Sequence, residues 1–361
     1  MKPPSSLRRR PSPKRFARLR RPLHLGVTPS LLPPLAARDD RRELGVVAVV
    51  VPCYRVAQRI DHVVRSMPAF VRHIIVVDDA CPVGSGDIAL SVGDPRVVLL
   101  RHGANRGVGG AMKTGFEHAL SLRVDVVVKM DGDGQMDPSW LPKLIEPLMR
   151  GRAAFTKGNR LRNLRQLSMM PFARRMGNIG LSFLTKVASG YWHISDPTNG
   201  YVALRSDVLA SLDVAALSNG YYFETSLLVE LGKHGFRIEE VAMPPRYDDE
   251  PSSLSIVRAL FGFPPRLLKS AACRFAYRHF WHDFTPSALL LLAGLPLVLW
   301  GLGFGGVSWW QSIREGAPAS AGTVMLAGLP FIIGVNFLLQ AVTFEMLGNF
   351  NNRTAGGGSD S

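Results

Sequence analysis

Cysteine is scarce in this chain, with three residues in 361, at Cys53, Cys81 and Cys273. An odd number of distant cysteines forms neither a disulfide framework nor a C-x-x-C metal motif, which favours a reducing compartment. Glycine is missing after the first apolar segment, where the sequence reads PCYRVAQR at 52–59. A dinucleotide-binding fingerprint requires glycines at that point, so the sequence speaks against NAD binding.

Acidic residues are also few, with 28 Asp and Glu against 43 Lys and Arg, for a net charge of +15. Residues 1–43 hold 12 basic and 3 acidic side chains, so 9 of the 15 excess charges lie there. The basic character is mostly a property of this tail and does not indicate a nucleic-acid-binding domain. Because the tail is rich in Pro and Arg and poor in apolar residues, it is predicted to be disordered.

Four valine- and isoleucine-rich segments follow the tail, separated by amphipathic stretches: GVVAVVVP at 45–52, HIIVVDD at 73–79, RVVLLRH at 96–102 and VDVVVKMD at 124–131. This alternation predicts a doubly wound α/β sheet, within a domain spanning residues 44–255. Three of the segments end in residues suited to ligand binding, and ligands bind at the carboxyl ends of such strands. The glycines of 105–115, NRGVGGAMKTG, indicate either a nucleotide loop or a helix packed closely on the sheet.

The segment around which the domain is organised is 124–138, where three buried valines lead into Asp131 and Asp133. Two carboxylates one residue apart can each give an oxygen to one Mg²⁺ or Mn²⁺ ion, which in turn neutralises a diphosphate. Gln135 is a candidate third ligand. The alternative is a solvated turn, since Asp and Gly are ordinary turn residues.

After Arg150 the chain becomes basic and loop-rich, with Arg160, Arg174 and Arg175 as the cations of interest. These side chains either clamp phosphate groups or form a solvated basic face.

The last part of the chain differs in kind, because residues 284–313 and 316–344 contain no charged side chain. A membrane helix needs about 20 apolar residues, so 285–347 is predicted to form two spans. Arg314 and Glu315 alone separate the two runs, which indicates a tight hairpin; buried core helices are the alternative. Segment 256–284 alternates cations with apolar residues and is predicted to lie on the bilayer surface. Its cations place the large domain in the cytoplasm, and 348–361 is predicted to be a flexible tail.

Taken in order, these segments resemble glycosyltransferase family 2, and within it the polyprenyl-phosphate glycosyltransferases of the dolichyl-phosphate mannose synthase type. The matching pieces are VVVPCY at 49–54, VVDDA at 76–80, NRGVGGAMKTG at 105–115, DGDGQMDP at 131–138, KGNR at 157–160, GN at 177–178, DPTNGY at 196–201 and FE at 223–224. The likeness covers roughly residues 45–255, and the terminal hairpin is similar to that of membrane-anchored members.

The resemblance implies a GT-A (Rossmann-like) fold and a nucleotide-diphosphate sugar donor. It places Pro52 and Tyr54 beside the nucleotide and Asp78 or Asp79 at the base or ribose. It implies that Asp131, Asp133 and Gln135 hold the metal ion and that Arg160 faces a phosphate group.

The chain departs from the family pattern at two places. Arg55-Val56 stands where Asn-Glu is common, and Ser252-Ser253-Leu254 lacks a phosphate-binding lysine, for which Arg246 and Arg258 are possible substitutes.

The kind of acceptor can be inferred from the groups that each acceptor would require in the protein. A sugar hydroxyl normally requires a carboxylate base, whereas a lipid phosphate is already ionised and requires cations and a membrane surface. Arg174, Arg175 and Asn178 are the candidates to bind that phosphate. We therefore expect a polyprenyl phosphate acceptor, with a single addition to a glycan or glycolipid hydroxyl as the alternative and a non-enzymatic membrane adaptor as a third reading. No Q-x-x-R-W motif of processive synthases is present. An oligomer is possible.

Overall fold

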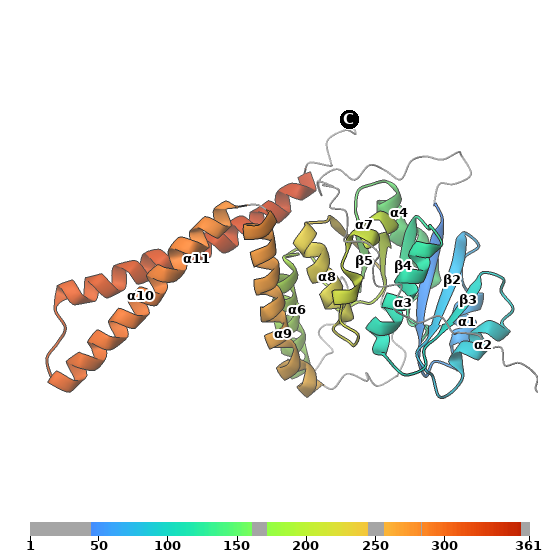
Figure 1. Ribbon diagram of the computed structural model, residues 1–361, viewed down its shortest axis with the longest axis horizontal. Helices are drawn as coiled ribbons and strands as arrows, with labels where there is room; N and C mark the ends of the chain where they lie inside the picture. The colour runs from blue at the N-terminus through green and yellow to red at the C-terminus, as the bar shows by residue number, and fades with distance from the viewer. Residues whose placement is uncertain (1–44, 161–171, 245–255, 283, 355–361) are drawn as a thin grey trace, which may run out of the picture.

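The computed structural model describes residues 45–160, 172–244, 256–282 and 284–354, with the helical backbone alone at 172–178, 256–263, 281–282 and 348–354. An α/β domain comes first, and a pair of long helices projects away from it (Figure 1).

Seven strands form one sheet in the order β3-β2-β1-β4-β6-β5-β7. Their bounds are β1 Val47–Cys53, β2 Val71–Asp78, β3 Val97–Arg101, β4 Val126–Lys129, β5 Phe155–Asn159, β6 Val202–Arg205 and β7 Ile238–Ala242. Every pair of neighbours is parallel except the two that involve β6, which runs antiparallel to β4 and to β5. The predicted doubly wound α/β sheet is confirmed, and β5 to β7 are additions that the sequence patterns did not indicate.

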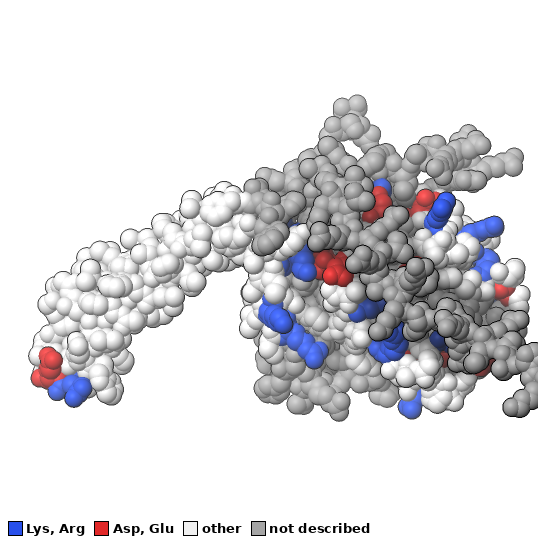
Figure 2. Space-filling view, in the orientation of Figure 1, with Lys and Arg blue, Asp and Glu red and all other residues white. Residues whose placement is uncertain are grey.

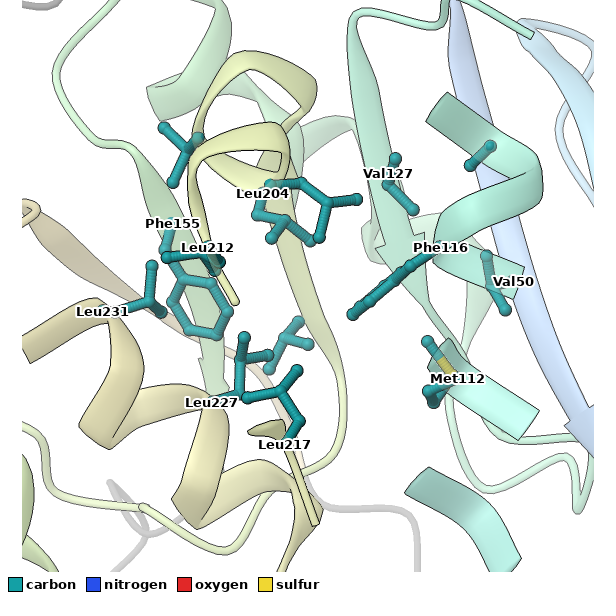
Figure 3. Packing of buried hydrophobic residues seen from close by; sticks show 14 of the residues in the cluster. Val50, Met112, Phe116, Val127, Phe155, Leu204, Leu212, Leu217, Leu227 and Leu231 are labelled. Carbon is teal, nitrogen blue, oxygen red and sulfur yellow. The ribbon is translucent and has the colours of Figure 1, made fainter. Parts of the chain in front are cut away.

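Helices cover both faces of the sheet. One face carries α1 Ile60–Arg65, α2 Ser85–Ser91 and α4 Leu141–Met149, and the other carries α3 Gly107–Ser121, α7 Ser206–Ser211 and α8 Phe223–His234. Successive strand residues point to opposite faces, so Val49 and Val50 of β1 belong to different cores. Figure 3 shows the core that holds Val50, with Phe116 of α3 and Leu227 of α8.

The glycines of α3 serve close packing. A side chain at Gly115 would overlap Val50 of β1, and a side chain at Gly109 would overlap the carbonyl oxygen of Ser218. Of the two interpretations of NRGVGGAMKTG, these contacts favour the helix packed on the sheet.

Helix α6, Phe172–Ser189, and helix α9, Ile256–Ala276, lie side by side at the edge of the α/β domain (Figure 1). A π-helical turn, Tyr277–His282, follows α9 and leads to α10, Pro286–Glu315, and α11, Ala321–Thr354. The predicted amphipathic segment is thus helical, with Leu267 buried against the domain and Leu268 exposed.

The two long helices pack on each other along their length as a hairpin. Gly294 and Gly334 allow a close approach of the two helices, since a Cβ on either would lie 2.8–2.9 Å from the carbonyl oxygen of the other. Both helices are long and apolar enough to cross a membrane, and only 17% and 6% of their most apolar windows are buried. The helices are therefore not core helices, and the predicted apolar hairpin is confirmed. On the face seen in Figure 2, the hairpin carries no charged side chain except at its tip.

Candidate active site

The candidate site lies at the carboxyl end of β4, where the backbone loop 130–137 is held by several hydrogen bonds. Arg59 donates from Nη1 to the carbonyl oxygen of Asp133 at 3.1 Å, and the Gln135 amide donates to Asp133 Oδ1 at 3.0 Å. Gly134 takes a left-handed φ of +75°, which closes the turn. Tyr201 donates its hydroxyl to the Asp137 carbonyl at 3.1 Å. The loop that carries the two predicted metal ligands is therefore fixed by the protein itself.

The reversed strand β6 brings a distant segment to this loop. Because β6 is antiparallel to its neighbours, its first residue, Val202, pairs with the last residue of β4, Lys129, and with Lys157 of β5. The preceding residues 196–200 therefore reach the same edge as Asp131. Gly200 lies so close that a Cβ there would be 3.1 Å from Asp131 Oδ2. The DPTNGY motif thus forms one wall of the candidate site.

Lys129 is a buried lysine between two carboxylates, and the sequence analysis did not identify it. Its ammonium lies 2.5 Å from Asp131 Oδ1 and 3.2 Å from Glu224 Oε1. Burial alone would lower the pKa of Lys129, but the two carboxylates outweigh it and raise the pKa above the usual value. Lys129 therefore stays charged, and Glu224, at the start of α8, joins the site through it. A lysine in a strand buried on both faces was the signal in the sequence.

Lys157 is a second buried lysine, in the middle of β5, and it pairs with the same residue of β6, Val202, as Lys129 does. Its ammonium donates to the carbonyl oxygen of Asn199. Burial lowers the pKa of Lys157 to about 8, although Asp196 and Glu224 act in the opposite direction. This side chain therefore changes charge near neutral pH, whereas Lys129 does not.

The Lys157 side chain makes folding stability depend on pH. The folded chain releases this proton near pH 8, while an unfolded lysine holds it to about pH 10.4, so the unfolded state binds more protons in between. We expect the unfolding free energy of the wild type to rise by about 1.4 kcal/mol per pH unit between pH 8 and 10, relative to Lys157→Met. Paired chemical unfolding curves at several pH values measure this difference. A difference that does not vary with pH would contradict the lowered pKa.

Arg160 leaves the edge of β5 and pairs with Asp196. Its Nε lies 3.0 Å from Asp196 Oδ2, while over a third of its side chain remains exposed at 37%. Burial tends to raise the pKa of Asp196, but the Arg160 guanidinium holds it below its ordinary value. Asp196 thus fixes Arg160 beside the DPTNGY wall, and the role of Arg160 towards phosphate stays a prediction.

The predicted nucleotide-binding residues lie at the ends of β1 and β2. Tyr54 is exposed by 40%, and the Arg55 guanidinium stacks over its ring at 5.4 Å from the centroid. Arg55 has a left-handed φ of +58°, which is unusual for a residue with a side chain. Pro52 pairs in register with Val77 of β2. The edge therefore offers an exposed aromatic ring and a cation where the resemblance places the nucleotide.

Asp78 and Asp79 are both buried and hold backbone groups. Asp78 accepts from the amides of Cys81 at 2.7 Å and Gly86 at 3.1 Å, which fixes the start of α2. Asp79 accepts from the amides of Arg106 at 2.8 Å and Gly107 at 2.7 Å. Both carboxylates therefore have a structural task, and their predicted contact with base or ribose stays a prediction.

The His102 ring is hydrogen-bonded to the Asp79 carboxylate. Its Nδ1 lies 2.6 Å from Asp79 Oδ1, and its Nε2 lies 2.9 Å from Thr114 Oγ1 of α3. This buried array ties the ends of β2 and β3 to α3, and the sequence alone gave no sign of it.

The remaining predicted residues lack described side chains. Arg174, Arg175 and Asn178 belong to the part of α6 whose backbone alone is described, and Arg246 lies outside the described residues. Their predicted roles stay predictions.

A metal ion at this edge would need ligands beyond the protein. Within the described ranges, no group of three or more His, Cys, Asp or Glu side chains is placed to hold one. Asp131 and Asp133 supply hard oxygen ligands, and Mg²⁺ is usually held by one or two carboxylates together with substrate phosphates. The residues present therefore fit an ion that a diphosphate completes.

Comparison with known proteins identifies a family, two relatives and a similar solved structure. The sequence profile of "Glycosyl transferase family 2" matches residues 48–212. The undecaprenyl-phosphate mannosyltransferase of Micrococcus luteus is 35% identical over 171 residues, which are 46% of this chain and 69% of that protein. The polyprenol monophosphomannose synthase of Mycolicibacterium smegmatis is 30% identical over 227 residues, covering 58% of this chain and 78% of that protein. Among solved structures, glucosyl-3-phosphoglycerate synthase from Mycobacterium tuberculosis is similar with a TM-score of 0.48 and 19% identity, covering 64% of this chain and 80% of that one.

Proposed function

Since this chain belongs to glycosyltransferase family 2, we propose that it transfers a sugar from a nucleotide-diphosphate sugar to a polyprenyl phosphate at the cytoplasmic face of the cell membrane. The observation that carries the proposal is that one chain combines a candidate diphosphate site with a hairpin able to cross a membrane. The Asp131–Asp133 loop lies at the ligand edge of the sheet, and α9 leads from the same domain into an apolar hairpin. The names of the two relatives support the lipid phosphate acceptor.

The donor half of the reaction uses the residues at the carboxyl end of β4. Asp131, Asp133 and Gln135 would hold Mg²⁺ or Mn²⁺, which when bound neutralises charge on the diphosphate. The Lys129 ammonium lies 2.5 Å from Asp131 Oδ1 and fixes the orientation of that carboxylate. Arg160 is partly exposed beside the same wall and can stabilise charge on the departing oxygens.

The acceptor half requires no proton transfer. A phosphate monoester oxygen is already ionised at neutral pH, so it attacks the anomeric carbon while the bond to the donor β-phosphate oxygen breaks. In-line attack inverts the anomeric centre, so an α-linked donor gives a β-linked lipid phosphate. The cations Arg174 and Arg175 would orient the acceptor phosphate.

The proposal is tested by incubating membranes that contain the enzyme with a panel of labelled UDP- and GDP-sugars. We expect label from one donor to enter an organic-soluble lipid in a chelator-sensitive manner. Purified enzyme that ignores polyprenyl phosphates yet glycosylates a sugar hydroxyl with the same donor would overturn the proposal.

A hydroxyl acceptor remains the second candidate, because Glu224 lies at the site. Such an acceptor needs a carboxylate base, and loss of a general base typically costs 10²–10⁴-fold in rate. In this structure Glu224 Oε1 is already paired with the Lys129 ammonium at 3.2 Å. We expect Glu224→Gln to retain lipid-phosphate transfer within about tenfold of wild type, measured as initial rate. A loss of about 10²–10⁴-fold would contradict an acceptor step that needs no general base.

Membrane topology gives a further expectation. If the α/β domain is cytoplasmic, the tip of the hairpin near Arg314 lies outside the cell. A Ser312→Cys variant, in a background with Cys81 and Cys273 replaced by Ser, should react with an impermeant thiol reagent in intact cells. Protection in intact cells together with labelling in inverted vesicles would contradict this orientation.

A further inference from the structure

The hairpin is joined to the α/β domain by a buried arginine, Arg274, near the end of α9. Its side chain is 2% exposed and donates from Nε to the Ala188 carbonyl at 2.8 Å and from Nη2 to the Val187 carbonyl at 3.1 Å. These carbonyls belong to the last turn of α6. The same Nη2 lies 2.5 Å from Glu345 Oε1 of α11. One guanidinium therefore connects three helices.

Two glycines make room for this side chain. A Cβ at Gly190, which has a left-handed φ of +79°, would lie 2.8 Å from Arg274 Nη1. A Cβ at Gly232 of α8 would lie 3.2 Å from Arg274 Cδ and would overlap the Ser189 carbonyl. Close approach of α6, α8 and α9 thus depends on small residues around the arginine.

Glu345 is a charged residue inside the second apolar span, Ala321–Leu347. Charged side chains within such spans are rare and expensive, and they are retained where they have a partner or a function. Glu345 has its partner in Arg274, on the other side of the junction between hairpin and domain. The pair therefore marks the place where the second span meets the domain.

A second contact fixes the start of the first span. His279 Nδ1 lies 2.6 Å from Thr285 Oγ1, and Thr285 caps α10 by accepting from the Ala288 amide at 3.4 Å. Both ends of the hairpin are thereby attached to the segment formed by α9 and its π-helical turn.

The helices held by Arg274 lead directly to the candidate site. Helix α8 runs from Gly232 back to Glu224, which contacts Lys129 beside Asp131. Helix α6 runs from Ala188 back to the segment that carries Arg174 and Arg175. A substitution that breaks the Arg274–Glu345 pair is therefore expected to shift both the carboxyl end of β4 and the predicted acceptor cations relative to the hairpin.

We infer that Arg274 is a positioning residue: through Glu345 it fixes the height and tilt of the catalytic edge above the bilayer, and so governs the use of a membrane-embedded lipid acceptor. The inference rests on the proposed function. It assigns to the pair a role in acceptor use that a purely stabilising ion pair would not have.

The experiment compares two acceptors with the same purified enzyme in vesicles. One is a long-chain polyprenyl phosphate embedded in the bilayer, and the other is a short-chain, water-soluble polyprenyl phosphate. Glu345→Leu is the first variant, because it removes the link to the hairpin and leaves the hydrogen bonds of Arg274 to α6 in place. Arg274→Met is the second. Glu146→Leu is the matched control, since it removes a carboxylate of α4 that pairs with Arg150 at 3.1 Å, away from the junction.

We expect both junction variants to raise KM for the embedded acceptor by roughly ten- to a hundredfold, the size of effect that small misplacements produce. KM for the soluble acceptor and the Kd of the nucleotide diphosphate should match wild type, as should every constant of Glu146→Leu. An equal loss with both acceptors, or no loss with either, would overturn the inference. A wild type that uses neither acceptor would instead overturn the proposed function.

Discussion

Replacing Asp133 by Ala is expected to abolish sugar transfer while the protein remains folded. The Asp133 carboxylate stands on a loop whose backbone carbonyls accept hydrogen bonds from the side chains of Arg59 and Tyr201, so the loop does not depend on the Asp133 side chain alone. Loss of one of two predicted metal ligands removes charge stabilisation of the departing diphosphate, which is worth at least about 10²–10³-fold in rate. Initial rates with labelled donor, together with circular dichroism, measure both parts of the expectation.

Chelation and a control variant complete this test. Divalent-cation chelation should reduce wild-type transfer to a similar extent, and added Mn²⁺ or Mg²⁺ should restore it. Asp213→Ala serves as the control, because the Asp213 carboxylate also accepts a backbone amide hydrogen bond, from Ala216 at 3.1 Å, but caps a surface turn. Full wild-type activity in chelator would contradict the metal prediction.

Lys129→Met is expected to lower both stability and activity strongly. The ammonium of Lys129 compensates two carboxylates, Asp131 and Glu224, and removing one partner of a buried ion pair costs about 3–5 kcal/mol. Transfer should fall as well, because Asp131 loses the contact that fixes its orientation. Denaturant unfolding of the solubilised protein and initial rates measure the two effects.

A control and a compensating change separate burial from charge. Lys143→Met removes an exposed ammonium that stacks on Trp140 at 4.3 Å, and we expect a loss within about 1 kcal/mol. Adding Glu224→Leu to Lys129→Met should recover part of the lost stability, because one uncompensated carboxylate is removed. A Lys129→Met variant as stable as Lys143→Met would show that the Asp131–Glu224 pair does not need the lysine.

Local sequence patterns predicted the elements of the site better than their contacts. The valine run before Asp131 predicted a buried strand with carboxylates at its end, since that information lies within a few neighbouring residues. The pairing of Lys129 with Glu224 joins residues 95 positions apart and depends on the packing of α8 against the sheet. No local pattern contains that information.

The antiparallel direction of β6 could likewise not be predicted from the sequence. A short apolar run such as Val202–Arg205 reads the same whether the strand is parallel or antiparallel, and only its neighbours decide. The two apolar spans were predictable, because membrane helices need length and lack of charge alone. The Arg274–Glu345 pair across the junction was not, since it joins two segments 71 positions apart.

The reversed strand β6 also bears on how the chain folds. In the native sheet β4 lies between β1 and β6, but β6 begins at Val202, long after β4 has been synthesised. Until β6 pairs, β4 is an edge strand with three consecutive valines, Val126 to Val128, and unpaired backbone groups. Such edges template association with other chains. Chains that end before Val202 are therefore expected to aggregate. Strand β6, which brings residues 196–200 to the candidate site, also protects β4 of the nascent domain.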